Sequence, residues 1–383
     1  MYLKHLNLES FRSFQDLQLD FNPNPGLNIF VGSNGVGKTN ILEAIYLLSF
    51  PRSFRTRHID SLVKEDSDYY LVEAKFDNFS DKTNVLEVFE NQPQTNQLKL
   101  GYQQNSNRKI FQRNSVDVDL KDFLSNLQTV MFSPEDLDLV ISSPRVRRRF
   151  LDLVLYEVDR EYFTANIHYS RLLNQRNAIL KHSKDLSQAR ADLAIWDIAF
   201  IKASMNVFNK RIELIESLQK FLPKSLEVFL PELAEDISLV YLVSGQSINL
   251  ASLNQEFIEK QLEKNLHRDI KTGYSSFGPH RDDFQLLIRQ KNVTEFCSRG
   301  QLRSLVLGLK LAQINYIESN CLKSPLLLLD DVFSELDSTR RHGLLQLAQN
   351  YQTFITAVEL SYFNDFEIDY SLFKVDKKQV NLL

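Results

Sequence analysis

A glycine-rich loop near the N-terminus has the residue types and the spacing of a phosphate-binding site. Residues 32–39 read Gly-Ser-Asn-Gly-Val-Gly-Lys-Thr, which fits the pattern G-x-x-x-x-G-K-[ST] at every fixed position. An apolar strand is expected before the loop at 27–31, and an amphipathic helix is expected after it at 40–50. The glycines let backbone N–H groups converge on phosphate oxygens, and the helix N-terminus favours an anion. The loop therefore predicts binding of nucleotide phosphates.

Two side chains of this loop have separate predicted roles. Lys38 supplies a point charge to the β and γ phosphates, and Thr39 supplies a hydroxyl to Mg²⁺. A glycine-rich turn that binds nothing is the alternative, but the chain has only 11 glycines and three of them fall in this loop. The residues expected to hold the phosphates are Gly32, Ser33, Asn34, Gly35, Val36, Gly37, Lys38, Thr39 and Asn40.

A second, acidic motif lies far along the chain. The apolar run 326–329 ends in Asp330 and Asp331. A buried strand here, beside the strand at 27–31, would bring Asp330 to the Mg²⁺ and leave Asp331 to orient the attacking water. Alone, such a strand is equally consistent with an ordinary strand-end turn. Thr39 and Asp330 are 291 positions apart, so a large insertion must split the nucleotide-binding core.

A third motif precedes this strand. Ser298, Gly300 and Gln301 open a helix that is expected at 301–320. A hydroxyl, a bare glycine backbone and a helix N-terminus together suit an anion. The alternative is a plain N-cap, in which a serine only satisfies the free N–H groups of the first turn. A Ser-Glu-Leu-Asp turn, 334–337, follows the acidic strand.

In this order, the four motifs resemble an ABC-type ATPase of the SMC class, and more closely the RecF family of bacterial recombination mediators. The resemblance spans essentially the whole chain. The segments that carry it are Gly-Ser-Asn-Gly-Val-Gly-Lys-Thr-Asn at 32–40, Phe-Ser-Pro-Glu-Asp-Leu at 132–137, Arg-Arg-Arg-Phe-Leu-Asp at 147–152, Gly-Pro-His-Arg-Asp-Asp at 278–283 and Ser-Arg-Gly-Gln at 298–301.

The resemblance implies an α/β fold, in which a P-loop ABC-type ATPase head carries an inserted, mostly helical second lobe. It implies ATP and Mg²⁺ as cofactors, a homodimer that forms on ATP, and a weak DNA-stimulated ATPase that acts as a switch. It further implies binding to double-stranded DNA and to junctions of single and double strands. RecR and RecO are the implied partners, and assistance to RecA loading in recombinational repair and replication restart is the implied role.

Several site residues take their roles from the resemblance. The helix start at 298–301 would cap the γ-phosphate held by the partner's loop, which makes each ATP site composite. Lys38 and Asp331 would be catalytic, and Asp337 would couple the two sites. Asp331 departs from the general ABC pattern, which has Glu there, and a shorter carboxylate suits a slow switch. The segment 132–137 lacks the Gln that ABC enzymes have in the corresponding loop.

Two clusters of arginines are candidates for DNA contact. One follows the helix at 40–50, and by the resemblance its Arg55 links phosphate contact to hydrolysis. The other lies between 145 and 184, where nine Lys/Arg face four Asp/Glu. Phosphate contacts of this kind give salt-dependent affinity without sequence preference. A solvated helix face, or a bridge between the lobes, would explain the second cluster equally well. The DNA-contact candidates are Arg52, Arg55, Arg57, Arg147, Arg148 and Arg149.

Composition places these motifs in an ordinary globular protein. The 383 residues include 43% hydrophobic and 25% charged side chains, and the formal charge is −4. The charge gives no overall indication of nucleic-acid binding. No apolar run approaches the roughly 20 residues of a spanning helix, and no signal segment is visible, so we expect a cytoplasmic protein without a membrane partner.

Strand and helix patterns alternate in a way that predicts two domains. The head is expected at 1–120 and 275–383, and the helical lobe at 121–274. The loop at 278–283 is expected to be structural, because two acids and one His in a turn are poor evidence of a metal site. Strands are expected at 2–8, 17–21, 27–31, 69–76, 84–90, 97–102, 109–113, 237–243, 283–289, 326–330, 354–358 and 372–375. Helices are expected at 40–50, across 144–230 with breaks near 181–186 and at Pro223, and at 250–269, 301–320 and 338–350.

Three other functions use the same loop. A nucleotide-binding subunit of an ABC transporter fits less well, because of the long insertion and the missing Gln. A P-loop kinase leaves the Ser-x-Gly-Gln helix unexplained. A scaffold that binds nucleotide without hydrolysis would release no phosphate on DNA.

Overall fold

The chain forms two compact units. The computed structural model describes residues 1–383 apart from 23, 25, 78–94, 184, 364–368 and 377–378. Unit 1 comprises Met1–Asp136 and Leu307–Leu383, and unit 2 comprises Leu137–Val306. These boundaries differ from the expected 120 and 275. The difference arises because a strand at 129–132 joins a sheet of unit 1, whereas the strand at 283–288 pairs with the strand at 237–242 in unit 2.

One layer of unit 1 is an antiparallel sheet with the strand order β2-β1-β4-β5-β6-β7. Its strands alternate between buried and more exposed residues, as a half-buried sheet requires. The expected strand at 84–90 lies outside the described residues. The strands are β1 (Tyr2–Phe11), β2 (Phe14–Asp20), β4 (Tyr69–Asp77), β5 (Thr95–Gln103), β6 (Arg108–Arg113) and β7 (Val116–Asp117).

The other sheet of unit 1 has the order β15-β14-β3-β13-β12-β8. Its strands from β14 to β8 run parallel, and the central strands β3, β13 and β12 are mostly apolar and almost entirely buried because both faces are covered. The expectation that the acidic strand lies beside the strand at 27–31 is wrong, because β13 lies between them. Strands β8 and β15 were not expected from the sequence. The strands are β3 (Leu27–Val31), β8 (Thr129–Phe132), β12 (Leu326–Asp330), β13 (Thr353–Ala357), β14 (Tyr370–Asp376) and β15 (Gln379–Leu382).

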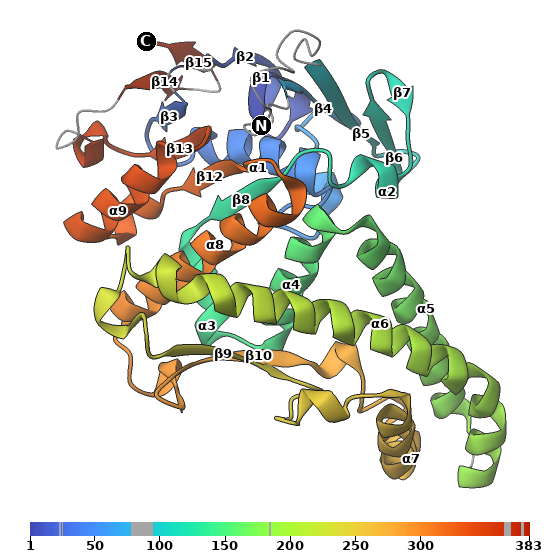
Figure 1. Ribbon diagram of the computed structural model, residues 1–383. Coiled ribbons are helices and arrows are strands. Elements are labelled where there is room, and N and C mark those ends of the chain that lie inside the picture. The colour runs from blue at the N-terminus through green and yellow to red at the C-terminus, as the bar shows by residue number, and fades with distance from the viewer. Residues whose placement is uncertain (23, 25, 78–94, 184, 364–368, 377–378) are drawn as a thin grey trace, which may run out of the picture. The chain divides into compact units, whose positions relative to one another are not determined.

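Helix α1 (Lys38–Ser49) packs against both sheets of unit 1 (Figure 1). It contacts β4 and β5 of the first sheet and β12 and β13 of the second. Most of its residues are therefore buried, including the apolar face Ile41, Ala44 and Ile45. Burial on both sides fixes the helix N-terminus at the carboxyl end of β3. The other helices with residues in unit 1 are α2 (Leu120–Phe123), α8 (Arg299–Cys321, which begins in unit 2) and α9 (Ser338–Ala348).

Unit 2 is built around a pair of long helices, α5 and α6, that pack against one another (Figure 1). The expected break near 181–186 is confirmed, but the expected break at Pro223 is wrong. The helix continues through Pro223 to Leu226 and ends there, so the proline stands in its last turn. A further division at Asp159 was not expected. The helices are α3 (Asp138–Ile141), α4 (Pro144–Val158), α5 (Arg160–His182), α6 (Leu186–Leu226) and α7 (Gln255–Thr272). Among the described residues, no helix is apolar enough over sufficient length to span a bilayer.

A small antiparallel sheet, β11-β10-β9, completes unit 2. Its strands are β9 (Ile237–Leu242), β10 (Asp283–Ile288) and β11 (Lys291–Asn292). Helix α7 begins five residues later than expected, because Asn254 caps it by accepting a hydrogen bond from the Phe257 N–H. It ends at Gly273, whose φ of 71° is left-handed and suits a C-terminal glycine.

Buried arginine–aspartate contacts join the helices of unit 2 to one another and to the 278–283 loop. Arg211 on α6 pairs with Asp152 at 2.8 Å and with Asp282 at 3.2 Å. Arg176 on α5 pairs with Asp269 on α7 at 3.2 Å. Both arginines and both interior aspartates, Asp269 and Asp282, are almost fully buried. The 278–283 loop is therefore structural, as expected, because its carboxylates neutralise interior arginines.

His280 in this loop is held neutral by its surroundings. Its Nε2 lies 2.8 Å from the carbonyl oxygen of Ser275, and its Nδ1 lies 2.6 Å from the hydroxyl of Tyr169. A carbonyl only accepts, so Nε2 carries the proton and Nδ1 accepts from Tyr169. Burial, with a smaller contribution from the neighbouring arginines, lowers the pKa of His280 to about 4, although the hydrogen bond to Ser275 opposes this shift.

We therefore predict that His280 makes unit 2 sensitive to mild acid. Between pH 6.5 and about 4 the unfolded chain binds a proton that the folded chain excludes, so stability falls as the pH falls through this window. The loss reaches about 3 kcal/mol at the acidic end, from about 1.4 kcal/mol for each unit of pKa. Urea unfolding of the wild type and of His280→Gln at several pH values measures the difference. An equally steep loss in His280→Gln would contradict the assignment.

Candidate nucleotide-binding site

The glycine loop between β3 and α1 is shaped by close approaches of the surrounding chain. A Cβ on Gly32 would lie 2.3 Å from the carbonyl oxygen of Val375. Gly37 has a φ of 113°, and a Cβ there would lie 2.8 Å from the Oγ of Ser13. Side chains at these two positions would displace the loop, so the glycines of the motif are needed for its geometry. No described side chain caps the start of α1, so its N–H groups remain available to an anion.

The side chain of Lys38, the first residue of α1, is bound to the carbonyl oxygens of this loop. Its Nζ donates to the carbonyl oxygens of Gly32, at 2.6 Å, and Ser33, at 2.9 Å. Burial lowers the pKa of Lys38, and the charges of Asp331 and Asp330 oppose that shift. The ammonium group is thus buried between loop carbonyls and two carboxylates, which is where a phosphate-binding lysine is expected to lie.

Asp330 is held by hydroxyl groups from two other elements. Its Oδ1 accepts from Thr39 Oγ1 at 2.8 Å and from Thr356 Oγ1 at 2.7 Å. Burial raises the pKa of Asp330, and the two hydroxyl donors oppose that shift. Thr39 and Asp330 therefore meet as the sequence predicts. A hydroxyl and a carboxylate are hard oxygen ligands of the kind that Mg²⁺ prefers, so the pair fits the predicted metal.

Asp331 has an unusual backbone conformation beside this pair. Its φ is 51°, in the left-handed region that few residues other than glycine adopt. The Asp331 N–H donates to Thr356 Oγ1 at 2.9 Å. Its Oδ1 is buried and has no hydrogen-bond partner among the described residues. Burial raises the pKa of this carboxyl, while Lys38 lowers it. A strained residue with a free buried carboxylate oxygen is suited to accept a hydrogen bond from a water or substrate.

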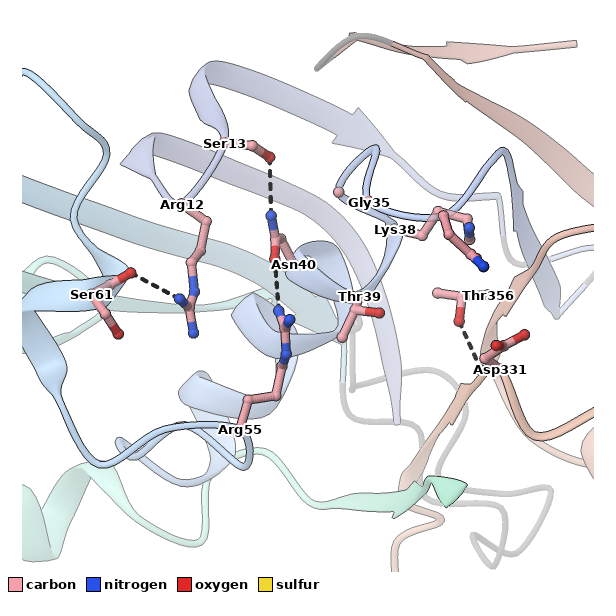
Figure 2. Close-up of a pocket in the computed structure, with 12 residues that line it drawn as sticks. Arg12, Ser13, Gly35, Lys38, Thr39, Asn40, Arg55, Ser61, Asp331 and Thr356 are labelled. Carbon is pink, nitrogen blue, oxygen red and sulfur yellow. Dashed lines mark hydrogen bonds between the residues drawn. The ribbon is translucent and has the colours of Figure 1, made fainter. Parts of the chain in front are cut away.

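These groups line a cavity of about 450 Å³ (Figure 2). In the close-up, Lys38, Asp331 and Thr356 lie on one side, Arg12, Asn40 and Arg55 on the other, and Thr39 between them. Polar groups dominate the lining, and its cations outnumber its carboxylates, which suits a phosphorylated ligand. The residues that line it are Arg12, Ser13, Asn34, Gly35, Gly37, Lys38, Thr39, Asn40, Arg55, Ser61, Asp331 and Thr356.

Arg12 and Ser13 are functional candidates that sequence reasoning missed. Both lie in the turn between β1 and β2, and Arg12 has a φ of 53°. The Arg12 guanidinium donates to both carboxylate oxygens of Glu43, at 2.9 and 2.8 Å. Glu43 on α1 is fully buried. A carboxylate on the buried face of a predicted helix needs a cation, and that signal could have led to Arg12.

Asn40 and Arg55 extend the rim of the cavity. Asn40 Nδ2 donates to Ser13 Oγ, and Asn40 Oδ1 accepts from Arg55 Nη1, each at 3.0 Å. Arg55 also lies 3.8 Å from Glu43. Arg55 therefore lines the nucleotide cavity, and its predicted DNA contact remains a prediction.

The 132–137 loop, which lacks the Gln of ABC enzymes, contains the acidic residues Glu135 and Asp136. Asp136 is engaged by the Lys310 Nζ at 2.8 Å and accepts from the Ser133 N–H. Lys310 also donates to the carbonyl oxygen of Met131, so it fixes the start of the loop. Glu135 is exposed, and its charge contributes to the raised pKa of Asp330. Glu135 is therefore the acidic residue of this loop whose charge acts on Asp330.

The start of α8 has the geometry of a reciprocal cap. Ser298 Oγ accepts from the Gln301 N–H at 3.2 Å, and Gln301 Oε1 accepts from the Ser298 N–H at 2.9 Å. The N-cap alternative is thus realised within the chain. The roles of Ser298, Gly300 and Gln301 at a partner's nucleotide remain predictions. Asp337 likewise caps α9 and pairs with Arg340, and its coupling role remains a prediction.

The remaining DNA-contact candidates lie in different environments. Arg147 is bidentate to Asp283, with distances of 2.6 and 2.9 Å. Arg148 donates to the carbonyl oxygen of Asp282 at 2.6 Å. For these two the geometry favours a structural role, because a phosphate would have to displace interior bonds. Arg52, Arg57 and Arg149 are exposed, so they remain candidates.

Comparison with known proteins gives one consistent result. The family described as "RecF/RecN/SMC N terminal domain" matches residues 2–381. "DNA replication and repair protein RecF" of Streptococcus pneumoniae strain P1031 is 34% identical over 385 residues, which cover 100% of each chain. The corresponding protein of serotype 4 strain TIGR4 is 34% identical over 377 residues, or 98% of this chain and 97% of the relative.

Solved structures agree in fold. "Recombination mediator protein RecF-ATPrS in RecFOR pathway" superposes with a TM-score of 0.86 at 30% identity, over 100% of this chain and 98% of the other. An Smc head bound to the C-winged helix domain of ScpA superposes with a TM-score of 0.54 at 14% identity, over 100% and 97%. The second likeness concerns the fold alone.

Substitution of Thr356 tests whether its hydroxyl holds Asp330 and Asp331 in position. We predict that Thr356→Val destabilises the protein by about 1–3 kcal/mol, because the Asp331 N–H loses its acceptor and Asp330 loses a donor. Nucleotide affinity should fall as well, since the Asp330 carboxylate and the Asp331 backbone each lose a positioning bond. Thr356→Ser keeps the hydroxyl and is the matched control. Denaturant unfolding and nucleotide titration measure both effects, and a fully stable Thr356→Val would show that the hydroxyl is dispensable.

Proposed function

This chain belongs to the RecF family, and we propose that it is an ATP-dependent DNA-binding protein of the RecF type that acts in DNA replication and repair. The observation that carries the proposal is the contact between Thr39 and Asp330, which assembles the two halves of a nucleotide site beside Lys38. Relatives aligned over their full length are DNA replication and repair proteins, and related solved structures include RecF with ATP.

ATP is the proposed ligand of the cavity. The glycine loop and the start of α1 would hold its phosphates, with Lys38 against the β and γ phosphates. Thr39 and Asp330 would hold Mg²⁺, which supplies charge neutralisation at the phosphates when bound. Arg12 and Ser13, at the opposite rim, would contact the remainder of the nucleotide. Arg55 lines the same cavity, so its contacts would change when the nucleotide binds.

Asp331 is the proposed base that orients the attacking water. Its free Oδ1 and its raised pKa suit acceptance of a proton or hydrogen bond from water. An aspartate reaches one methylene less far than a glutamate, so the water is held less firmly. We therefore propose slow hydrolysis, which suits a switch better than a motor.

A homodimer that forms on ATP is the proposed active species. The exposed start of α8 would reach the nucleotide of a second copy, so that two ATP molecules join two subunits in an isologous pair. Ser298, Gly300 and Gln301 would supply N–H groups and a hydroxyl to the γ-phosphate. ATP then stabilises the dimer by linkage, and hydrolysis releases it. Asp337 is proposed to couple the two sites.

Double-stranded DNA and its junctions with single strands are the proposed DNA ligands. RecR and RecO are the proposed protein partners, and assistance to RecA loading is the proposed outcome. A related solved structure is that of a recombination mediator in the RecFOR pathway, which supports RecR and RecO as partners. The exposed Arg52, Arg57 and Arg149 are proposed phosphate contacts in addition to Arg55, and DNA is proposed to stimulate hydrolysis.

Turnover of two site variants tests the catalytic assignment. We predict that Asp331→Asn binds Mg-ATP with nearly unchanged affinity but loses at least about 100-fold in turnover, the scale of a lost general base. Lys38→Ala is the contrasting variant, because it should lose nucleotide affinity itself. Phosphate release and equilibrium nucleotide binding separate the two effects. Normal turnover by Asp331→Asn would show that Asp331 is not catalytic.

A further inference from the structure

Unit 2 contains a second polar cavity, of about 270 Å³, that is separate from the nucleotide site. Helix α7 contributes one wall, the turn that follows β9 contributes another, and the 276–281 loop forms the third. Its lining contains two arginines and, among the described residues, no carboxylate. The residues that line it are Ser244, Gln246, Gln261, Asn265, Arg268, Ser276, Phe277 and Arg281.

Two buried aspartates hold the walls of this cavity together. Asp282 accepts from the Ser244 N–H at 2.9 Å, which fixes the turn after β9. Asp269 on α7 accepts from the Ser276 N–H at 3.0 Å, which fixes the loop against the helix. The Gly278 N–H also donates to Ser244 Oγ at 2.9 Å. Because these bonds are internal, the cavity is preformed.

The same aspartates form ion pairs with arginines outside the cavity lining. Asp282 pairs with Arg211, and Asp269 pairs with Arg176, in the interior of unit 2. Arg268 and Arg281 are exposed, and their guanidinium groups have no partner in the described part of the chain. Asp269 and Asp282 are thus already neutralised by interior arginines, whereas the positive charges of Arg268 and Arg281 are not neutralised by any described residue.

The floor and sides of the cavity supply further donors. Ser276 Oγ is buried and makes no hydrogen bond with any described residue. Gln261, Asn265 and Arg268 lie four and three positions apart on α7, so they share one face of the helix. Phe277 is the one apolar side chain in the lining, and it is 5% exposed. An acidic peptide would need apolar contact area that the cavity lacks, whereas a phosphate needs several donors around one charge.

We infer that this cavity binds a phosphate group of a nucleic-acid backbone, through Arg268 and Arg281. The inference rests on the proposed function, since it supplies unit 2 with a DNA contact. It also replaces Arg147 and Arg148, whose guanidinium groups are occupied by Asp283 and by the 282 carbonyl. With one unpaired guanidinium in each of two walls, the cavity can contact one phosphate from two sides, which suits positioning of a strand without reading its sequence.

The salt dependence of DNA binding tests this site. We predict that Arg268→Gln/Arg281→Gln lowers the slope of log K against log salt by about 0.9, the contribution of the one phosphate contact that is lost. Duplex DNA is titrated with the full-length protein and Mg-ATP at several salt concentrations. Lys224→Gln/Lys291→Gln removes two exposed charges of unit 2 outside the cavity and is the matched control. Gln261→Glu, which adds a carboxylate to the lining, should also weaken binding.

Each outcome distinguishes this inference from the proposed function. A wild-type slope in Arg268→Gln/Arg281→Gln, with DNA still bound, overturns the cavity site and leaves the proposed function intact. Absence of DNA binding by the wild type overturns both. In a second experiment, inorganic phosphate is added to the wild type and to Arg268→Gln/Arg281→Gln. If it raises the melting temperature of the wild type only, while both proteins keep the same DNA slope, the cavity is a site for free phosphate and the backbone assignment is wrong.

Discussion

The hydrogen bonds of Asp330 with Thr39 and Thr356 are the constraint on which the nucleotide site depends. A buried carboxylate is costly unless donors surround it, and these two hydroxyls come from α1 and β13. They can reach it only because β3, β13 and β12 are parallel neighbours whose carboxyl ends meet at one sheet edge. Because Lys38 precedes Thr39 and Asp331 follows Asp330, this junction also brings Lys38 and Asp331 to the same cavity.

Much of this arrangement could be predicted from the sequence. The strand at 27–31 and the strand at 326–330 were expected at their observed bounds, because both are short, apolar runs that end at motif residues. The glycine pattern also predicted the loop that close contacts at Gly32 and Gly37 now explain. Motif spacing indicated that one core is split by an insertion, and unit 1 consists of two segments that flank unit 2 in the sequence.

Other features were not predictable, because they depend on long-range partners. The apolar strand at 129–132 looks like any buried segment until β12 is known to pair with it. Arg147 looks like a free basic residue in the sequence, and only the fold brings Asp283 to it from 136 positions away. Arg12 was missed for the same reason, since its partner Glu43 lies on another element.

The mass of Asp331→Asn in solution, with and without Mg-ATP, shows whether two subunits share each ATP site. We expect a change from the 44.6 kDa of one chain to about 90 kDa, twice that mass, as an isologous pair requires. The same variant with Ser298→Arg added should bind ATP and keep the mass of one chain. If Asp331→Asn binds ATP and also keeps the mass of one chain, the composite site is wrong. The cavity around Lys38 would then serve a monomer.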